Sequence, residues 1–391
     1  MATPAAGGRV RSIDTVRGLA MVLMAIDHVR VYSGLPAGGP TPGIFFTRWV
    51  THLVAPAFVF LAGTAIYLRG ARLANRRALA LGLVRRGLWL VLLELTVLRV
   101  AWTFNLRFDE YLLAGVIWML GWCMVAMAAV VFLPWQAVGA TGAAIVVTHN
   151  LVDLVDPARL AALMGGEPGW LLRIAYFGGA VPLGADGPPL LVLFVIVPWL
   201  GVMMAGYAFG AVMAWPSERR RTFCLRLGLA LTMAFVLLRL ANGYGDPRPW
   251  AGGRMPVGLA FLNTSKYPAS LLFLLMTLGP VIAAVGLAER WRGPVAGVPA
   301  TFGRVPLLYY LLHIPVIHAA ALAVSLLREG RVDPWLFGNH PMAPPPVPEG
   351  YAWSLPLLYL VFTIAVAALY VPCRWFAQRR AERPAPWMAW L

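Results

Sequence analysis

Ten apolar runs divide this chain, and each is about as long as a helix that crosses a lipid bilayer. Of the 391 residues, 60% are hydrophobic and 12% are charged, whereas soluble domains carry about 25% charged residues. The sequence therefore predicts an all-α integral membrane protein. We place its transmembrane helices at about residues 13–33, 48–69, 79–102, 111–133, 137–154, 189–214, 222–241, 267–288, 303–327 and 352–376.

Arginine-rich segments set the expected orientation of these helices. They precede the first span, join spans two to three, six to seven and eight to nine, and follow span ten, so ten spans place all of them on one side. We expect that side, with both termini, to be cytoplasmic, in a multi-pass protein of the cytoplasmic (inner) membrane. Residues 1–391 are expected to form a single transmembrane domain, with a core over about residues 10–375.

The composition also excludes several classes of protein. The net charge of +16 is accounted for by arginines in the short loops between spans, so nucleic-acid binding is not expected. Cys123, Cys224 and Cys373 have neither CxxC nor histidine-paired spacing. Neither a metal site nor a disulfide framework is therefore indicated, and no metal is expected as a cofactor.

The first apolar run carries charged residues that a simple membrane anchor would lack. Arg17 and His28 are eleven residues apart, which places them about 20° from the same helix face, with a rise of about 16 Å between them. Ionisable side chains inside a membrane are costly and commonly functional. Asp27 adjoins His28 but projects about 100° away from it, so we consider it the weaker catalytic candidate.

Two interpretations stand for each of these residues. His28 is either a general base or a neutral imidazole bonded to a neighbouring helix, and its place inside the membrane favours the base. Arg17 either binds the phosphates of a cofactor entering from the basic side or pairs with Asp14, which is three residues away on the same helix. The sequence leaves both roles of Arg17 open.

Polar residues in other spans extend the set of candidates. His52 follows Arg48 in the second span at a depth comparable with His28, so it either shares a site with His28 or lies at the membrane interface. Glu94 in the third span is expected to pair with another helix. His313 falls near the middle of the membrane in the ninth span.

Further candidates lie at the expected outer side. Asp109 and Glu110 are adjacent acids that either cap a helix or receive an amine or a sugar. The segment around Asn263, Lys266 and Tyr267 is expected to begin a helix and to face an outer vestibule, where its polar groups could bind substrate.

Several motifs resemble those of a known superfamily. Arg17 and His28, within the helix that begins Ser12-Ile13-Asp14-Thr15-Val16-Arg17-Gly18, resemble the first span of the transmembrane acyltransferases. The second span, from Thr51-His52 to Ala62-Gly63, resembles the heparan-alpha-glucosaminide N-acetyltransferase branch, which is related to the family-three membrane acyltransferases. Phe261–Pro268 and Phe302–His313 are similar to segments of bacterial relatives in that branch.

The resemblance implies an activity and a set of roles. Relatives move an acyl group from cytoplasmic acyl-coenzyme A, commonly acetyl-coenzyme A, to a carbohydrate on the outer side. Family-three enzymes have an essential arginine and histidine at the positions of Arg17 and His28. The glucosaminide enzyme instead has asparagine at the position of His28 and a histidine in the following loop, and residues 31–46 of this chain contain no histidine. Either His28 or His52 could therefore be the base.

The leading hypothesis is an acyltransferase in the lipid bilayer that modifies an envelope glycan or amino sugar. A transporter of a polar or acylated metabolite is the alternative, because polar groups inside the bundle suit it also. A non-catalytic membrane scaffold is the third class. The sequence is compatible with a homodimer and does not fix the acceptor, the acyl chain, or O- versus N-transfer.

Overall fold

The computed structural model describes residues 9–39, 41–73, 75–253, 255–342 and 344–391. Most of these residues are helical, and the chain divides into two compact units. One unit consists mainly of Ala55–Leu95 and Phe108–Glu289, and the other of Arg11–Val54, Thr96–Arg107 and Arg290–Leu391. We call them the central unit and the terminal unit.

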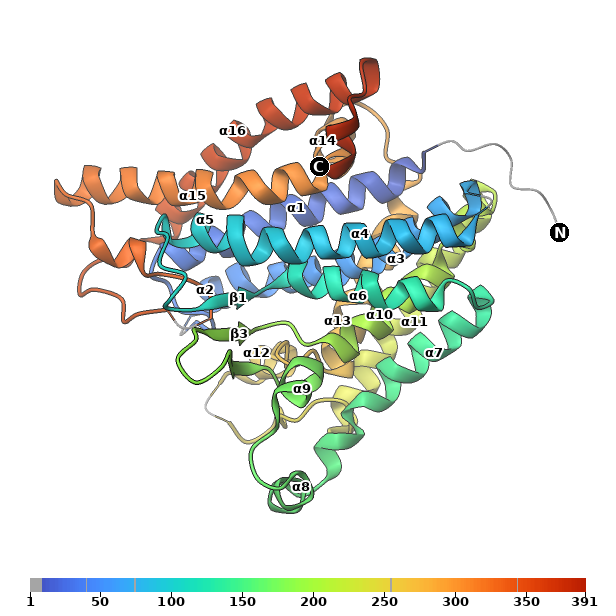
Figure 1. The fold of residues 1–391 in the computed structure, drawn as a ribbon, viewed down its shortest axis with the longest axis horizontal. Coiled ribbons are helices and arrows are strands. Elements are labelled where there is room, and N and C mark those ends of the chain that lie inside the picture. The colour runs from blue at the N-terminus through green and yellow to red at the C-terminus, as the bar shows by residue number, and fades with distance from the viewer. Residues whose placement is uncertain (1–8, 40, 74, 254, 343) are drawn as a thin grey trace. The chain divides into compact units, whose positions relative to one another are not determined.

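The central unit is built from paired helices. Its principal pairs are α4 with α6, α7 with α10, and α11 with α13 (Figure 1). Its helices are α3 (Val54–Arg72), α4 (Arg76–Leu93), α6 (Val116–Val130), α7 (Trp135–Thr148), α8 (Pro157–Met164), α9 (Trp170–Leu172), α10 (Ile196–Phe209), α11 (Ser217–Ala241), α12 (Val257–Leu262) and α13 (Leu271–Ala288). Short 3-10 or π turns are η2 (Glu94–Leu98), η3 (His149–Leu154), η4 (Arg173–Phe177) and η5 (Val212–Ala214).

Glycines allow the helices of each pair to approach closely. A Cβ atom added to Gly228 on α11 would lie 2.6 Å from the carbonyl oxygen of Gly279 on α13. Gly87 and Gly121 face each other in the same way between α4 and α6, as does Gly142 with the carbonyl oxygen of Gly201 between α7 and α10. Because lipid tails are as apolar as the side chains, helices in a membrane associate through this kind of close backbone packing.

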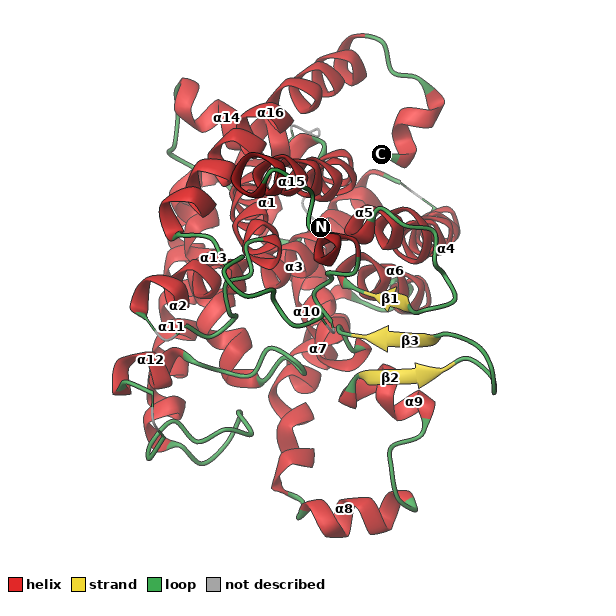
Figure 2. Cartoon of the chain, turned by 90° about the vertical axis from the view of Figure 1, so that its left-hand side faces the viewer, coloured by secondary structure: helices red, strands yellow, loops and turns green. Residues whose placement is uncertain are grey.

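A small sheet lies in the central unit and was not expected from the sequence. Strands β1 (Leu112–Ala114), β3 (Pro189–Val192) and β2 (Gly179–Pro182) lie side by side in that order (Figure 2). β1 is parallel to β3, and β2 is antiparallel to it. Strands of three or four residues inside apolar runs have too little periodicity to be distinguished from the start of a helix. The run predicted as one helix over residues 189–214 therefore begins as a strand.

The terminal unit is centred on α1 (Arg11–Tyr32). This helix packs against α14 (Pro294–Arg304), α15 (Pro306–Glu329) and α16 (Leu355–Glu382). The approach of α1 to α14 is close, because a Cβ atom added to Gly303 would overlap the backbone of Asp14 and one added to Gly18 would overlap that of Pro299. The remaining elements are α2 (Pro42–Trp49), η1 (Val50–Leu53), α5 (Arg99–Thr103), η6 (Pro334–Phe337) and η7 (Pro386–Trp390).

The membrane-spanning character is confirmed, whereas the count of ten remains a prediction. Within the described residues, seven helical runs are long and apolar enough to cross a membrane. The runs are Pro42–Arg72, Trp135–Leu154, Ile196–Ala214, Ser217–Ala241, Leu271–Ala288, Pro306–Glu329 and Leu355–Glu382. α6 is shorter and apolar, and α1 carries several charges along its length.

The start of α13 differs from the expected one. The sequence predicted a helix from residue 267, with Pro268 in its first turn. The helix instead begins at Leu271, and the Ser270 hydroxyl accepts a hydrogen bond from the Phe273 N–H at 3.1 Å. A serine N-cap satisfies a backbone donor that the first turn leaves unpaired, which explains why the helix starts here.

Two glycines of α14 provide a test of the close approach in the terminal unit. Gly303→Ala would force α1 and α14 apart, and we expect a loss of about 1–3 kcal/mol of stability, seen as a lower thermal midpoint of the purified protein. Gly297→Ala is the matched control, because its Cβ would meet nothing within 4 Å. Equal thermal midpoints for the two variants would contradict the close contact of α1 with α14 at Gly303.

Candidate functional site

Two histidines from opposite ends of the chain meet in the terminal unit. His28 lies on α1 and His313 on α15, and Nδ1 of His28 is 2.6 Å from Nε2 of His313. Their rings stack with centroids 4.8 Å apart. His313 is fully buried, whereas His28 is partly exposed. The sequence had singled out both residues without predicting that they meet.

The partner of His313 determines where the protons lie in the neutral pair. Nδ1 of His313 is 2.6 Å from the carbonyl oxygen of Tyr310, and a carbonyl oxygen can only accept a hydrogen bond. His313 therefore carries its proton on Nδ1 and accepts on Nε2, so Nδ1 of His28 is the donor between the two rings. The neutral His28 ring then has its lone pair on Nε2, the nitrogen that could accept a proton from a substrate.

Aromatic side chains hold the His28 ring from the side. Trp102 on α5 meets it edge-on, with ring centroids 5.0 Å apart. Tyr32 stacks on Trp102 and donates its hydroxyl proton to the Trp102 carbonyl oxygen at 2.6 Å. His318 lies between Tyr32 and Phe104, with centroids 4.8 Å and 3.9 Å away. These stacked rings hold the C-terminal end of α1 against α5 and α15.

Arg17 lies near the N-terminal end of the same helix, where it forms the ion pair foreseen as one alternative. Its Nη1 is 3.7 Å from Oδ1 of Asp14, and it donates to the carbonyl oxygen of Gly303 at 3.3 Å. The Arg17 side chain is 16% exposed. The close contact of α1 with α14 thus places the guanidinium beside the Gly303 carbonyl oxygen.

The other candidates of the terminal unit have separate surroundings. Asp27 accepts from Nε of Arg30 at 2.7 Å, which holds its carboxylate beside its own helix. His52 lies on η1 and is 4% exposed. Arg48 lies on α2, and its carbonyl oxygen accepts from the Thr51 hydroxyl at 2.6 Å.

Glu94 belongs to the central unit, where it caps a helix. Its Oε2 accepts from the backbone N–H groups of Ile117 and Trp118, at 2.9 Å and 3.2 Å. Gly115 leaves room for this carboxylate, because a Cβ atom there would lie 2.6 Å from Oε1. The first N–H groups of α6 lack partners within the helix, so Glu94 satisfies them and stabilises the α6 N-terminus.

Apart from Arg48, the expected substrate-binding residues lie in the central unit too. Asp109 and Glu110 are exposed in a turn. Lys266 is 9% exposed, and its Nζ lies 5.2 Å from the Tyr267 ring centroid. The carbonyl oxygen of Asn263 accepts from Arg239 at 3.3 Å.

A buried ion pair that the sequence did not reveal shapes this segment. Asp246 and Arg239 are 3.9 Å apart, with both side chains 1% exposed. Oδ2 of Asp246 also accepts from the Ser265 N–H at 2.7 Å and from the Ser270 hydroxyl at 2.8 Å. The charges are therefore stabilised by several hydrogen bonds, and the backbone around Lys266 is held in place.

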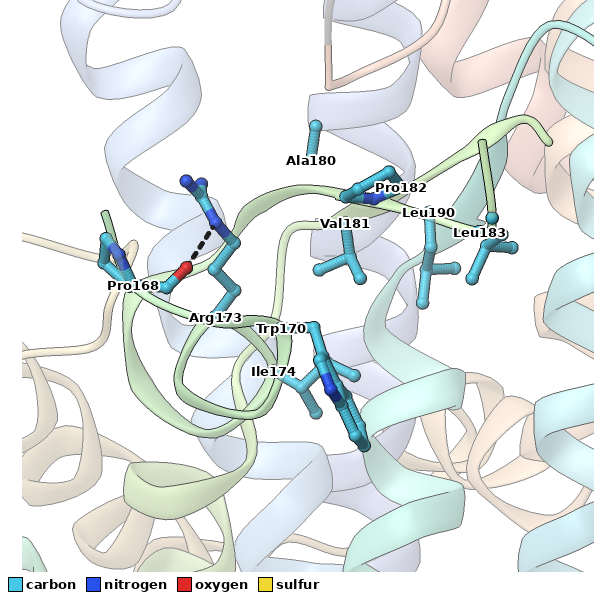
Figure 3. A pocket seen from close by; sticks show the side chains of 10 residues that line it. Pro168, Trp170, Arg173, Ile174, Ala180, Val181, Pro182, Leu183 and Leu190 are labelled. Carbon is cyan, nitrogen blue, oxygen red and sulfur yellow. Dashed lines mark hydrogen bonds between the residues drawn. The ribbon is translucent and has the colours of Figure 1, made fainter. Parts of the chain in front are cut away.

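An apolar cavity of about 820 Å³ opens near β2 in the central unit (Figure 3). Arg173 lies at its edge and donates to the Pro168 carbonyl oxygen at 2.9 Å and to Glu167 at 2.9 Å. Trp170, Ile174, Val181 and Leu190 line it. The Arg173 guanidinium at the cavity edge is thus hydrogen-bonded to the adjacent loop.

Among the described residues, no group of three or more histidines, cysteines or acids could hold a metal ion. The polar groups of the terminal unit instead form pairs and stacks, with His28 and His313 at the centre.

The apolar helical runs define a multi-pass membrane protein, and comparison with known families identifies its class. The catalytic family of heparan-alpha-glucosaminide N-acetyltransferase matches residues 9–238, more than half of the chain. The protein belongs to this family and is thus a membrane acyltransferase by class. No curated protein matches the chain. Arg17 and His28 lie within the matched segment, whereas His313 lies beyond it.

His340, in the loop between α15 and α16, is expected to make the stability of the protein depend on pH. Burial and, to a smaller extent, the charge of the Arg99 guanidinium lower the pKa of His340 from the ordinary 6.5 to about 4. The unfolded chain then binds a proton near pH 6.5 that the folded chain takes up only near pH 4, so stability is lost as the pH falls through this interval.

We expect His340→Gln to weaken the fall of the thermal midpoint between about pH 6.5 and pH 4. Wild-type and variant protein would be melted over this pH series in the same detergent. Parallel curves for the two proteins would contradict the prediction.

Proposed function

We propose that this protein transfers an acyl group, in the first instance acetyl, from cytoplasmic acyl-coenzyme A to a carbohydrate hydroxyl or amine on the outer side of the membrane. The observation that carries the proposal is the chain of hydrogen bonds from His28 through His313 to the Tyr310 carbonyl oxygen, in a member of an acetyltransferase family. Such a chain suits a histidine that must take up and return a proton.

His28 acts as the base in this proposal. Its Nε2 removes the proton from the acceptor oxygen or nitrogen as that atom attacks the thioester carbonyl carbon. The bond between this carbon and sulfur then breaks, and the departing thiolate takes the proton from Nε2. His313 accepts the hydrogen bond from Nδ1 of His28 throughout, which keeps the ring oriented and stabilises its positive charge.

Arg17 is proposed to bind a phosphate of the coenzyme. Its planar guanidinium lies beside Asp14 and Gly303, and the forked N–H donors of arginine pair well with phosphate oxygens. Asp14 would orient the guanidinium rather than contact the donor itself. Because Asp14 offsets part of the charge, the affinity for the coenzyme should depend on both residues.

The remaining assignments belong to the same proposal. His52 is the alternative base, and Asp27 is a weaker one because Arg30 holds its carboxylate. Acceptor recognition is assigned to polar groups at the expected outer side, namely Arg48, Asp109, Glu110, Asn263, Lys266 and Tyr267. The acceptor is an envelope glycan or an amino sugar. A single domain of ten spans in the inner membrane and a homodimer remain compatible with this function.

The test of the base uses labelled acetyl-coenzyme A, purified protein and envelope glycans. We expect His28→Ala to lower the transfer rate by about 10²–10⁴-fold, because a positioned base contributes that much. His52→Ala is the matched comparison and should retain transfer. Loss of transfer in His52→Ala alone would make His52 the base. Unchanged transfer in both variants would rule out either assignment, and flux of the substrate into liposomes without a covalent product would favour a transporter.

The role of His313 has its own test. His313→Ala removes the acceptor for Nδ1 of His28, and we expect kcat to fall about 10²-fold while KM for acetyl-coenzyme A changes little. His313→Gln offers a carbonyl oxygen in place of Nε2 and should recover part of the rate. A fall in kcat that is identical in the two variants would contradict the role of His313 as the hydrogen-bond acceptor for His28.

A further inference from the structure

One exposed face of α11 combines arginines with aromatic rings. Arg219, Thr222, Phe223 and Arg226 recur at spacings of three and four residues, so they share one side of the helix. With Trp215 and Glu218 they line a hollow of about 470 Å³. We call this set the basic hollow.

The two arginines of the basic hollow, Arg219 and Arg226, have exposed side chains. The Arg219 guanidinium lies 4.3 Å from the centroid of the Trp215 ring, and its side chain is exposed. Arg226 is exposed too and has no ion pair among the residues that the structure describes. The acid of the hollow, Glu218, lies 4.0 Å from Arg221.

Arg220 shows the contrasting case on the same turn of the helix. Its Nε and Nη2 reach the two carboxylate oxygens of Glu289, and Nε is 2.9 Å from Oε1. Ser217 donates to the same carboxylate at 2.9 Å. This arginine joins α11 to the end of α13, whereas Arg219 and Arg226 are exposed.

The basic hollow continues into an apolar stripe along the same helix. Leu229, Met233, Leu237 and Leu240 are 63%, 47%, 62% and 57% exposed. They follow Arg226 at helical spacing and extend about 21 Å beyond it, compared with about 15 Å for one leaflet of the hydrocarbon core. The helix is one of the apolar runs that can span a membrane, so this stripe would contact lipid chains.

We propose that this face of α11 binds an anionic phospholipid. Its phosphate lies between Arg219 and Arg226, and its acyl chains follow Leu229, Met233 and Leu237. Basic groups at the end of a span attract anionic headgroups, and arginine stems can lie along apolar surface while the guanidinium reaches the phosphate. The inference goes beyond acyl transfer and does not depend on it.

The geometry favours a lipid over the other possible occupants. A free phosphate would use the arginines but leave the apolar stripe without a role. A second copy of the chain related by two-fold symmetry would bring this face against itself, and so bring arginines toward arginines. A phospholipid matches both the charge and the apolar continuation.

The test measures the thermal midpoint of the purified full chain in neutral detergent as phosphatidylglycerol or phosphatidylcholine is added. We expect phosphatidylglycerol to raise the thermal midpoint by several degrees, since a ligand that binds the folded state stabilises it. Phosphatidylcholine, whose headgroup carries no net charge, should not raise it. The double variant Arg219→Gln, Arg226→Gln should lose most of this shift. The matched control Arg379→Gln, Arg383→Gln removes two exposed arginines from the end of α16 and should keep it.

Four results would overturn the proposal. The double variant could keep the full shift, which would place the lipid elsewhere. The control could lose the shift equally, which would indicate a general charge effect. Inorganic phosphate at matched concentration could give the same shift, which would exclude a role for the acyl chains. Finally, the double variant could convert a dimer to a monomer while its response to lipid is unchanged, which would make this face an interface between copies.

Discussion

Close backbone contact at glycines is the constraint on which both units of this protein depend. Helices inside a bilayer gain little from hiding apolar surface from one another, so their association depends on packing. Gly228 with Gly279 illustrates this in the central unit, and Gly303 against Asp14 in the terminal unit. The second contact also places a carbonyl oxygen beside Arg17, so the same approach that joins α1 to α14 orients a charged side chain.

Several buried polar groups bond to a partner from another segment of the chain. Glu94 caps α6, Asp246 holds the segment before α13, and His28 meets His313. An unpaired polar group is costly where water is absent, so these pairings fix the packing of the helices that carry them. In the terminal unit these hydrogen bonds also affect the chemistry. Because His28 donates from Nδ1 to His313, the lone pair of the neutral His28 ring lies on Nε2.

Local features of this chain could be predicted from the sequence, whereas the long-range pairings could not. A helix was expected over about residues 13–33 and lies at Arg11–Tyr32, because the length of the apolar run determines it. The pairing of Asp14 with Arg17 was one of two alternatives, since spacing on one helix permits it. The contact of His28 with His313 depends on how α1 and α15 pack, and neither residue's neighbours in the sequence encode that. The short strands β1 and β3 were missed because their residues resemble the apolar runs around them, and β2 lies between two predicted spans.

The two histidines are separated by 285 positions along the chain. During synthesis, α1 is therefore made long before α15 exists, and the His28 ring cannot receive its ordered partner until most of the polypeptide has been inserted. A truncated product that ends with the family-matched segment at residue 238 would contain Arg17 and His28 but not His313. The tautomer of His28 is in this sense a property of the completed protein, which couples the ordering of this ring to the last stages of assembly.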